Sequence, residues 1–495
     1  MTVKSVRVLG LLFAASVAFV ALVALGGCAG SPAASDTRRI YADAAQRIGA
    51  DRVPVVVVPG ILGSKLEESA TGRSVWGAFV YGAADADRPD GARLIALPMR
   101  EGAALADLRD DVVATEALDT VKIDTLGFVR GVTIEAYAGV LKTLGAGNYR
   151  DPLLARGSQI DYGGEHFTCF QYAYDWRRDV AESAAGLAGA IRSAQIAARN
   201  ARGMAADEPL KVDVVAHSMG GMVLRYYLRY GDQPLPEDGS LPELTWAGAK
   251  DVRWAVLVGT PSGGSVLSLQ QMVNGMNLHP IAPHYRPAVM GTMPAIYQLF
   301  PRTRHARVID ERTGEAIDIF DADEWARLDW GLVSEGAERW LRILLPGLSP
   351  EARRRTARDH LEKSLHRAEQ LHRALDVPGE PPAGTELVLF AGDAEETAEV
   401  LSVDERGRLR VAETSPGDGT VTRHSALMDE RIGSAWRPRL QSPIAWSQVR
   451  FLAEDHVGLT TSPAFTNDLL FLLLEARDPG SGERLSVGSD AGVTP

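Results

Sequence analysis

The segment VVAHSMGG, residues 214–221, places a serine between an apolar run and a pair of glycines. The run before Ser218 is typical of a buried strand and the residues after it are typical of a helix. A strand, a one-residue turn and a helix would project the Ser218 hydroxyl from a strained backbone. That turn needs small residues two positions to either side, here Ala216, where glycine is usual, and Gly220. We expect Ser218 to be a nucleophile; the alternative is a buried serine in a small-residue turn.

A serine hydroxyl needs a base, because it is a poor nucleophile unaided. His456 is the strongest candidate, since it ends the last apolar run, in SQVRFLAEDHVG, just before the final helical segment. His424 is the alternative base, although no strand precedes it directly. His217 is next to Ser218 in sequence, and we expect its side chain to point away from the hydroxyl.

The base in turn needs a carboxylate that orients the imidazole ring and stabilises its charged form. Asp418 lies in a glycine-flanked turn, SPGDGTV, thirty-eight residues before His456. Asp393 also follows a predicted strand, in LFAGDAEE. Position alone leaves both aspartates open as the acid.

Two backbone N–H groups would stabilise the oxyanion that forms when an ester is attacked. One belongs to Met219, at the start of the predicted helix. The other lies just after the first predicted strand, where Ile61 follows Gly60. No metal site is expected, because the histidines at 360, 366 and 372 are spaced so that they share no helical face, and no organic cofactor is implied.

Six short apolar runs, most of them separated by helical patterns, favour an α/β fold with a doubly wound, mostly parallel sheet. We predict strands at residues 53–58, 167–174, 210–216, 253–258, 386–391 and 447–453. We predict helices at residues 133–147, 179–200, 220–231 and 463–476.

Two long insertions interrupt this alternation, at residues 66–130 and 262–385. Insertions after sheet strands usually cover the carboxyl ends of the strands, where open α/β sheets bind ligands. We therefore expect a lid from the first insertion and a large helical cap from the second. Residues 306–320 and 400–414 have hairpin-like patterns.

The N-terminal residues carry the pattern of an export signal. Two basic residues precede an apolar stretch, and the stretch closes with LGGC at residues 25–28, which resembles the lipobox of bacterial lipoproteins. We expect a signal peptide over 1–27, lipid on Cys28, a tether over 28–50 and a disordered tail over 479–495. The alternative is an uncleaved transmembrane anchor. With Cys28 lipidated, Cys169 has no partner for a disulfide, and we interpret it as a core residue.

The placement that follows is an exported protein held at a membrane. Ala29 after the lipidated cysteine fits the periplasmic face of an outer membrane, if the cell is Gram-negative. A formal net charge of −12 argues against a nucleic-acid partner, because phosphate binding requires a positive field. Nothing in the sequence sets the oligomeric state.

Taken together and in order, several segments resemble the lecithin:cholesterol acyltransferase and lysosomal phospholipase A2 family, and they cover most of a domain over 51–478. The segments are VPVVVVPGILGSKLE (53–67), YAYDWRRD (172–179), VVAHSMGGMVLRYYL (214–228), GTPSGGS (259–265) and GDGTV (417–421), together with His456. The resemblance implies an α/β-hydrolase fold, a triad of Ser218, Asp418 and His456, and oxyanion donors at Ile61 and Met219. It selects Asp418 over Asp393.

The resemblance also implies a lipid substrate, whose acyl group passes from serine to water or to an alcohol. It places Trp76 on the acyl path, with core packing as the alternative. The family's cysteine-bounded lid is missing, since the first insertion has no cysteine, and no apolipoprotein partner is assumed. Asp175 and Arg177 are expected to brace a loop, and Trp325, Trp330 and Trp340 to pack the cap rather than seat it on a bilayer. The rival functions are a lipase or esterase on neutral or small esters, and a non-catalytic lipid-binding lipoprotein.

Overall fold

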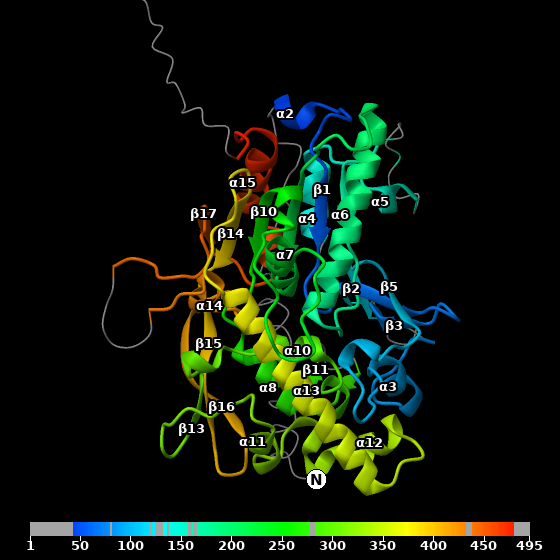
Figure 1. Cartoon of the computed structure of the whole chain (residues 1–495), viewed down its shortest axis with the longest axis vertical. Coiled ribbons are helices and arrows are strands. Elements are labelled where there is room, and N and C mark those ends of the chain that lie inside the picture. The colour runs from blue at the N-terminus through cyan, green and yellow to red at the C-terminus, as the bar shows by residue number, and fades with distance from the viewer. Residues whose placement is uncertain are drawn as a thin grey trace, which may run out of the picture.

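The computed structural model describes residues 43–79, 82–118, 120–123, 132–135, 138–156, 161, 166–277, 283–431 and 438–479. Within these residues the six predicted apolar runs form one sheet in which every neighbouring pair of strands is parallel (Figure 1). From one edge to the other, its strands are β17 (Gln448–Leu452), β14 (Glu386–Gly392), β10 (Val252–Val258), β9 (Val212–His217), β1 (Val55–Val58) and β8 (Cys169–Gln171).

The direction of strand addition reverses beside β1. From β1 the chain moves to one neighbour, β8, and then returns to the opposite side to form β9 and the remaining strands. An open parallel sheet binds ligands at the carboxyl ends of the strands that flank such a reversal. In this chain those ends lead into Ile61, after β1, and into Ser218, after β9.

Both faces of the sheet are buried, which explains why its strands are continuously apolar. In β1, Val56 and Val58 pack into one hydrophobic cluster, while Val55 and Val57 pack into another on the opposite face. The first face is covered by α6 and α7, and the second by α4 and α15. These helices span α4 (Ala138–Ala146), α6 (Val180–Arg202), α7 (Met219–Tyr230) and α15 (Pro463–Leu474).

One predicted helix is partly wrong. The segment predicted as helical over 133–147 begins with a strand, β7 (Val132–Glu135), which pairs antiparallel with β6 (Thr120–Ile123), and only then enters α4. Residues 132–134 read Val-Thr-Ile, and β-branched side chains favour a strand when a partner strand is available.

The first insertion is richer in strands than its irregular sequence indicated. Two small three-stranded sheets form there, one from β2, β3 and β5 and the other from β4, β6 and β7. The remaining elements of this part of the chain are β2 (Ser64–Glu68), β3 (Ser74–Trp76), β4 (Ala78–Phe79), α3 (Pro89–Ile95), β5 (Val112–Ala117) and α5 (Pro152–Arg156).

The second insertion forms a cap, which fills the lower part of Figure 1 below the sheet. Its longest element, α13, begins after the capping residue Ser349 and packs against α10, α12 and the core helix α7. The cap elements are α8 (Val266–Asn274), β11 (Met276–Asn277), β12 (His284–Tyr285), α9 (Pro287–Met290), α10 (Pro294–Gln298), β13 (Val308–Asp310), α11 (Ala322–Arg327), α12 (Glu338–Leu344) and α13 (Pro350–Asp376).

A long hairpin follows β14. Its strands, β15 (Glu395–Val403) and β16 (Leu409–Gly417), pair antiparallel and confirm the hairpin predicted at 400–414. The hairpin predicted at 306–320 is short: one bridge joins Ile309 and Ala316, the N–H of Asp310 donates to the carbonyl of Glu315, and the N–H of Ile317 donates to the carbonyl of Val308. Strand β13 also pairs with β15. The short helix α14 (Arg423–Leu427) follows this hairpin. Short 3-10 helices occur at Leu105–Asp107, Ala249–Asp251, Thr303–His305, Gly331–Val333, Glu335–Ala337 and Gly458–Thr460.

The described part of the predicted tether lies against the domain. Helix α2 (Asp43–Gln46) contacts α15, and the side chain of Ala45 is fully buried. Cys28, the predicted signal peptide and residues 480–495 lie outside the described residues. Across the residues that are described, no helix is both long and apolar enough to cross a membrane.

Candidate active site

The turn that carries Ser218 is strained and tightly packed. The Ser218 backbone has φ 53° and ψ −126°, in the left-handed half of the map that non-glycine residues rarely adopt. A Cβ atom at Gly220 would lie 2.4 Å from the carbonyl oxygen of Pro59, and one at Gly221 would lie 1.9 Å from Oγ1 of Thr260. The glycines after the serine are therefore required by the close approach of α7 to the loops after β1 and β10.

Three side chains that are far apart in sequence form a continuous hydrogen-bonded chain. Ser218 Oγ lies 3.0 Å from His456 Nε2, and His456 Nδ1 lies 2.8 Å from Asp418 Oδ2. Ser218 is at the end of β9, Asp418 follows β16, and His456 follows β17. With Nδ1 protonated toward Asp418, the Nε2 lone pair is free to accept the proton of the Ser218 hydroxyl.

The Asp418 carboxylate is buried and held from two directions. Its second oxygen accepts hydrogen bonds from the backbone N–H groups of Thr420, at 3.0 Å, and Val421, at 2.7 Å. Burial raises the pKa of Asp418, but the facing His456 and these hydrogen bonds lower it by more, so the pKa lies below its ordinary value. The carboxylate is thus kept ionised beside the imidazole.

Asp393, the other aspartate that the strand pattern left open, has a different partner. Its carboxylate forms an ion pair with Arg423 at 2.6 Å and makes no contact with His456. The β15–β16 hairpin explains the ambiguity. It pairs Glu395 with Gly417 and so returns the chain, at Asp418, to the end of β14 that Asp393 also follows.

The His217 side chain contacts His456 rather than the Ser218 hydroxyl. Its ring centroid lies 4.8 Å from that of His456, and its Nε2 donates to the backbone carbonyl of His456 at 2.9 Å. Burial, together with the charge on neighbouring His456, lowers the pKa of His217 to about 3. His217 is therefore a neutral donor that holds the loop of His456, and its sequence position gave no sign of this contact.

The other predicted histidines lie away from this chain of contacts. His424 faces His305, with ring centroids 5.4 Å apart, and accepts from the guanidinium of Arg307 at 3.3 Å. His360 and His372 each bond one backbone carbonyl inside the cap, and His366 is exposed. No group of three or more potential metal ligands occurs among the described residues.

The two predicted oxyanion donors belong to different parts of the chain, the start of α7 and the loop after β1. Met219 is the first residue of α7, where helical N–H groups have no partner within the helix. Ile61 lines the same cavity as Ser218, and its N–H donates to no acceptor among the residues that the structure describes. The helix dipole adds partial positive charge at this point.

Ser218 and His456 open into a cavity of about 310 Å³. The two insertions contribute most of its wall, which is largely apolar. None of the described lining residues is Lys, Arg, Asp or Glu, so no fixed charge faces a ligand there. The wall includes Leu62, Trp76, Leu118, Trp176, Leu267, Met276, Tyr285, Met290, Met293, Ile296 and Leu299, with Ser265, Ser268, Gln271 and Thr420 as its polar members.

Trp76 lies in the cavity wall and is packed among aromatic side chains, which supports core packing and leaves its place on an acyl path a prediction. It lines the cavity, yet only 3% of its surface is exposed, and its Nε1 donates to the carbonyl of Leu62 at 2.7 Å. Edge-on contacts join it to Trp176, at 5.2 Å, and to Tyr285, at 5.4 Å. Neither of these two aromatic residues was singled out from the sequence, because an isolated aromatic carries no spacing signal.

Part of the chain, including Ser218, is similar to a known protein family. Residues 161–320 match the lecithin:cholesterol acyltransferase family. This acyltransferase-family segment contains Ser218 and Met219, whereas Ile61, Asp418 and His456 lie outside it. The match confirms the resemblance found in the sequence and supports a hydrolase or acyltransferase of lipid esters. No curated protein sequence matches the chain.

Solved structures resemble the chain over most of its length. A chain in the crystal structure of the Tle4–Tli4 complex has a TM-score of 0.50 and 15% sequence identity, with 86% of this chain and 99% of that chain covered. EstA from Clostridium botulinum has a TM-score of 0.33 and 14% identity, with 87% and 89% covered. The chain has the α/β-hydrolase fold, as predicted.

Within the acyltransferase-family segment, Asp175 and Arg177 brace a loop as expected. The Arg177 guanidinium is fully buried and binds Asp175 at 2.7 Å and Asp110 at 3.0 Å. It also donates to the carbonyls of Leu94 and Ile95, both at 3.1 Å, which ties the first insertion to the loop after β8. Neither Asp175 nor Arg177 lines the cavity.

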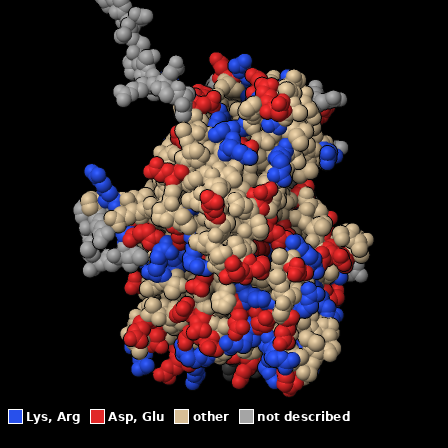
Figure 2. All heavy atoms as spheres, viewed as in Figure 1, with Lys and Arg blue, Asp and Glu red and all other residues tan. Residues whose placement is uncertain are grey.

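The three cap tryptophans follow the acyltransferase-family segment and are buried. Trp325 and Trp330 are 0% and 1% exposed, and both indole N–H groups donate to backbone carbonyls. Trp340 is 9% exposed. These side chains pack the cap, and on the face shown in Figure 2 the surface of the cap carries interspersed acidic and basic residues.

Cys169 is a core residue, as expected. It is 2% exposed in β8, and burial raises the pKa of its thiol well above the ordinary value, so the thiol stays protonated.

Proposed function

We propose that this chain is a serine-dependent acyl hydrolase or acyltransferase that acts on phospholipids or related lipid esters. The observation that carries the proposal is the hydrogen-bonded chain of Ser218, His456 and Asp418 at the wall of an apolar cavity. The three hydrogen-bonded residues are suited to acyl transfer, and the apolar wall of the cavity is suited to binding the acyl chain of a lipid.

In the proposed reaction, Ser218 Oγ attacks the ester carbonyl carbon while His456 Nε2 takes the hydroxyl proton. The oxyanion is stabilised by the N–H groups of Ile61 and Met219. The intermediate then collapses, the ester C–O bond breaks, and His456 gives the proton to the departing alcohol. Water or an alcohol attacks the acyl-Ser218 ester in the same way, with His456 again as base, and releases an acid or a new ester.

A fluorophosphonate probe and lipid vesicles test this proposal. We expect the probe to label the wild-type protein and not Ser218→Ala. Vesicles of mixed phospholipids should yield lysophospholipid and fatty acid, and an added long-chain alcohol should yield its ester, both measured by mass spectrometry. If the probe fails to label the wild type and the products match those of Ser218→Ala, the chain is a lipid-binding protein and the enzymatic proposal is wrong.

Neutral esters are a second candidate substrate class, because the described residues that line the cavity include no Lys, Arg, Asp or Glu. No described lining residue is placed to pair with a phosphate or a charged head group, which suits neutral esters equally well. Parallel assays with triacylglycerol emulsions, phospholipid vesicles and a soluble short-chain ester distinguish the two classes. Turnover that is fastest on the soluble ester and unaffected by vesicles would favour an esterase.

We also propose that the domain over 51–478 is exported and held at a membrane through lipid on Cys28, with residues 28–50 as the link. Support comes from the basic, apolar and LGGC pattern of the N-terminal sequence. Expression with labelled palmitate should give a labelled membrane-bound protein, and Cys28→Ala should release an unlabelled one. Label retained by Cys28→Ala would contradict lipidation at this residue.

A further inference from the structure

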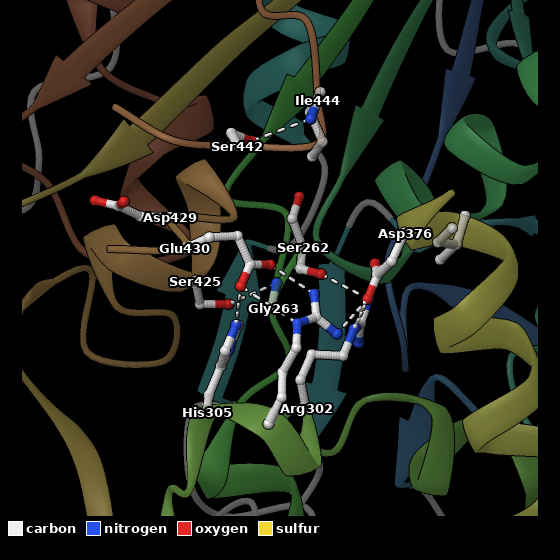
Figure 3. Close-up of polar contacts among 12 residues, drawn as sticks. Ser262, Gly263, Arg302, His305, Asp376, Ser425, Asp429, Glu430, Ser442 and Ile444 are labelled. Atoms are coloured by element: carbon white, nitrogen blue, oxygen red, sulfur yellow. Dashed lines mark hydrogen bonds and ion pairs between the residues drawn. The ribbon is translucent and has the colours of Figure 1, made fainter. Parts of the chain in front are cut away.

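Arg302 lies between the cap and the loop after β10, and its side chain is only 1% exposed. It forms a two-pronged ion pair with Asp376, the last residue of α13, through Nε at 2.9 Å and Nη2 at 3.2 Å (Figure 3). The same Nη2 donates to the carbonyl of Ser262 at 2.8 Å, and the Arg302 backbone N–H donates to the carbonyl of Gly263 at 3.2 Å. One residue thus fixes the first turn of the loop after β10 to the end of the cap helix.

That loop in turn holds the segment that carries Asp418. Gly263 N–H donates to the carbonyl of Ser425 at 3.0 Å, and Ser425 Oγ donates to the carbonyl of Gly264 at 2.6 Å. Ser265 Oγ donates to the carbonyl of Thr420 at 2.7 Å. Since the N–H of Thr420 binds the Asp418 carboxylate, contacts run without a break from Asp376 to Asp418.

Segment 302–305 makes a second connection to the same region. Arg304 binds both Asp376, at 2.8 Å, and Glu430, at 2.6 Å, and His305 Nε2 lies 3.1 Å from Glu430. Figure 3 shows His305 and Arg302 rising from the same segment toward Glu430 and Asp376. The Arg304 side chain is 43% exposed, so its ion pairs are screened by water, unlike that of Arg302.

The chemistry of the buried pair indicates a positioning role. Burial raises the pKa of Asp376, but the guanidinium groups of Arg302 and Arg304 lower it by more, so the carboxylate remains ionised. A buried ion pair is weak evidence for a role in stability, because proteins in which apolar residues of similar volume replace such a pair are often equally stable. A planar guanidinium does supply fixed donor directions, which an apolar pair cannot.

We propose that Arg302 is a positioning residue that, through Ser262 and Gly263, sets the place of Asp418 relative to His456. This inference rests on the proposed function, because it assumes that Asp418 acts on His456 during acyl transfer. The cap would then contribute to the reaction by fixing the acid loop as well as by lining the cavity.

The test uses the full-length protein and the double variant Arg302→Met, Asp376→Leu, which removes both members of the ion pair. The buried Arg225, which Asp376 also stabilises, loses that carboxylate too, so the melting temperature of the variant is measured alongside its activity. We expect kcat for p-nitrophenyl butyrate to fall between roughly 10- and 100-fold, the cost of a small misplacement of a reacting group, with KM within about twofold. The rate of fluorophosphonate labelling should fall by the same factor. Arg304→Gln is the matched control. It also removes an ion pair with Asp376, but Arg304 does not contact the loop after β10, so we expect kcat to change less than about twofold.

A pH profile separates positioning from a general loss of structure. A displaced Asp418 would stabilise the charged imidazole of His456 less, so the acid limb of the pH profile of kcat/KM should move to lower pH in the double variant. A protein that is only less stable would instead show a lower melting temperature and an unchanged acid limb. A folded double variant with wild-type kcat and an unmoved acid limb overturns the inference. Absence of labelling in the wild type would instead defeat the proposed function itself.

Discussion

The histidines at the edge of the sheet and the histidines inside the cap are used in opposite ways. At the sheet edge, His456 bonds two side chains, Ser218 and Asp418, and its ring faces the cavity. Inside the cap, His360 and His372 each bond one backbone carbonyl, at 3.1 and 2.9 Å, and neither lines the cavity. The partner of the ring, rather than burial alone, separates a histidine placed for proton transfer from one placed for packing.

His217 lies between these two cases. It lines the cavity, as His456 does, but bonds a backbone carbonyl, as the cap histidines do. The comparison therefore predicts a graded series. Losses of Ser218, His456 or Asp418 should be largest and the loss of His217 intermediate. Losses of the cap histidines, or of cap residues that only line the cavity, should appear in stability or selectivity rather than in the chemical step.

The largest effect is expected for Asp418→Asn. An amide in place of the carboxylate keeps the shape of the residue but favours the wrong tautomer of His456, so kcat should fall by about 10³- to 10⁴-fold. Asp393→Asn is the matched control, because it lies at the same end of β14 and loses only a partly exposed ion pair. We expect that variant to stay within about twofold of wild type. Rates of p-nitrophenyl butyrate hydrolysis measure both, and the reverse pattern would assign the acid to Asp393.

The next effect is expected for His217→Phe, which keeps a ring but leaves the carbonyl of His456 without its donor. An unsatisfied buried acceptor costs about 1–3 kcal/mol, so kcat should fall by about 5- to 150-fold with little change in KM. His217→Gln restores a donor and should recover most of the activity. Equal activity for Phe, Gln and wild type would mean that this contact does not position His456.

The pattern of residues was sufficient to predict the six core strands, Ser218 and His456, and the physical reason is clear. Strands buried on both faces are continuously apolar, and the residues that follow them fall at one edge of the sheet. The choice between Asp393 and Asp418 needed the family resemblance, because the β15–β16 hairpin returns the chain to its starting point, and local patterns do not encode strand pairing.

Other features depend on contacts that sequence distance hides. The orientation of His217 is set by the loop of His456, which is distant in sequence, and the link from Arg302 to Asp418 passes through backbone carbonyls. Backbone atoms are the same at every residue, so these contacts leave no mark in composition or spacing. The strand at the start of the predicted 133–147 helix arises likewise from its pairing with β6.

The cap histidines should appear in the pH dependence of stability. Burial lowers the pKa of His372 to about 3 and that of His360 to about 4, whereas an unfolded histidine titrates near 6.5. The unfolded state therefore binds more protons, and the stability that each neutral ring contributes is present above about pH 6.5 and lost as pH falls toward 4. Between pH 7.5 and 5.5 the loss is about 1.4 kcal/mol per histidine.

Urea denaturation at these two pH values measures this effect. His372→Gln, which keeps a donor for the carbonyl of Gln298, should lose about 1.4 kcal/mol less than wild type over the interval. His366→Gln is the control, because His366 is exposed on the same helix, and its pH dependence should equal that of wild type. Identical behaviour of all three proteins would show that the ring of His372 is protonated without cost.

The smallest effect is expected where the cap meets the cavity without any polar contact. Leu267, on α8, lines the cavity and is only partly buried, so a larger side chain there should narrow the cavity with little cost to folding. We expect Leu267→Trp to lower kcat/KM for a palmitoyl ester about three- to tenfold relative to a butyryl ester, since shape differences in apolar pockets are worth about 1 kcal/mol. Leu267→Met, of similar volume, should leave the ratio unchanged. If both variants lower kcat/KM equally for the two esters, Leu267 acts through His456 and Ser218 rather than through contact with the acyl chain. The expectation that cavity-lining cap residues set selectivity alone would then be wrong for Leu267.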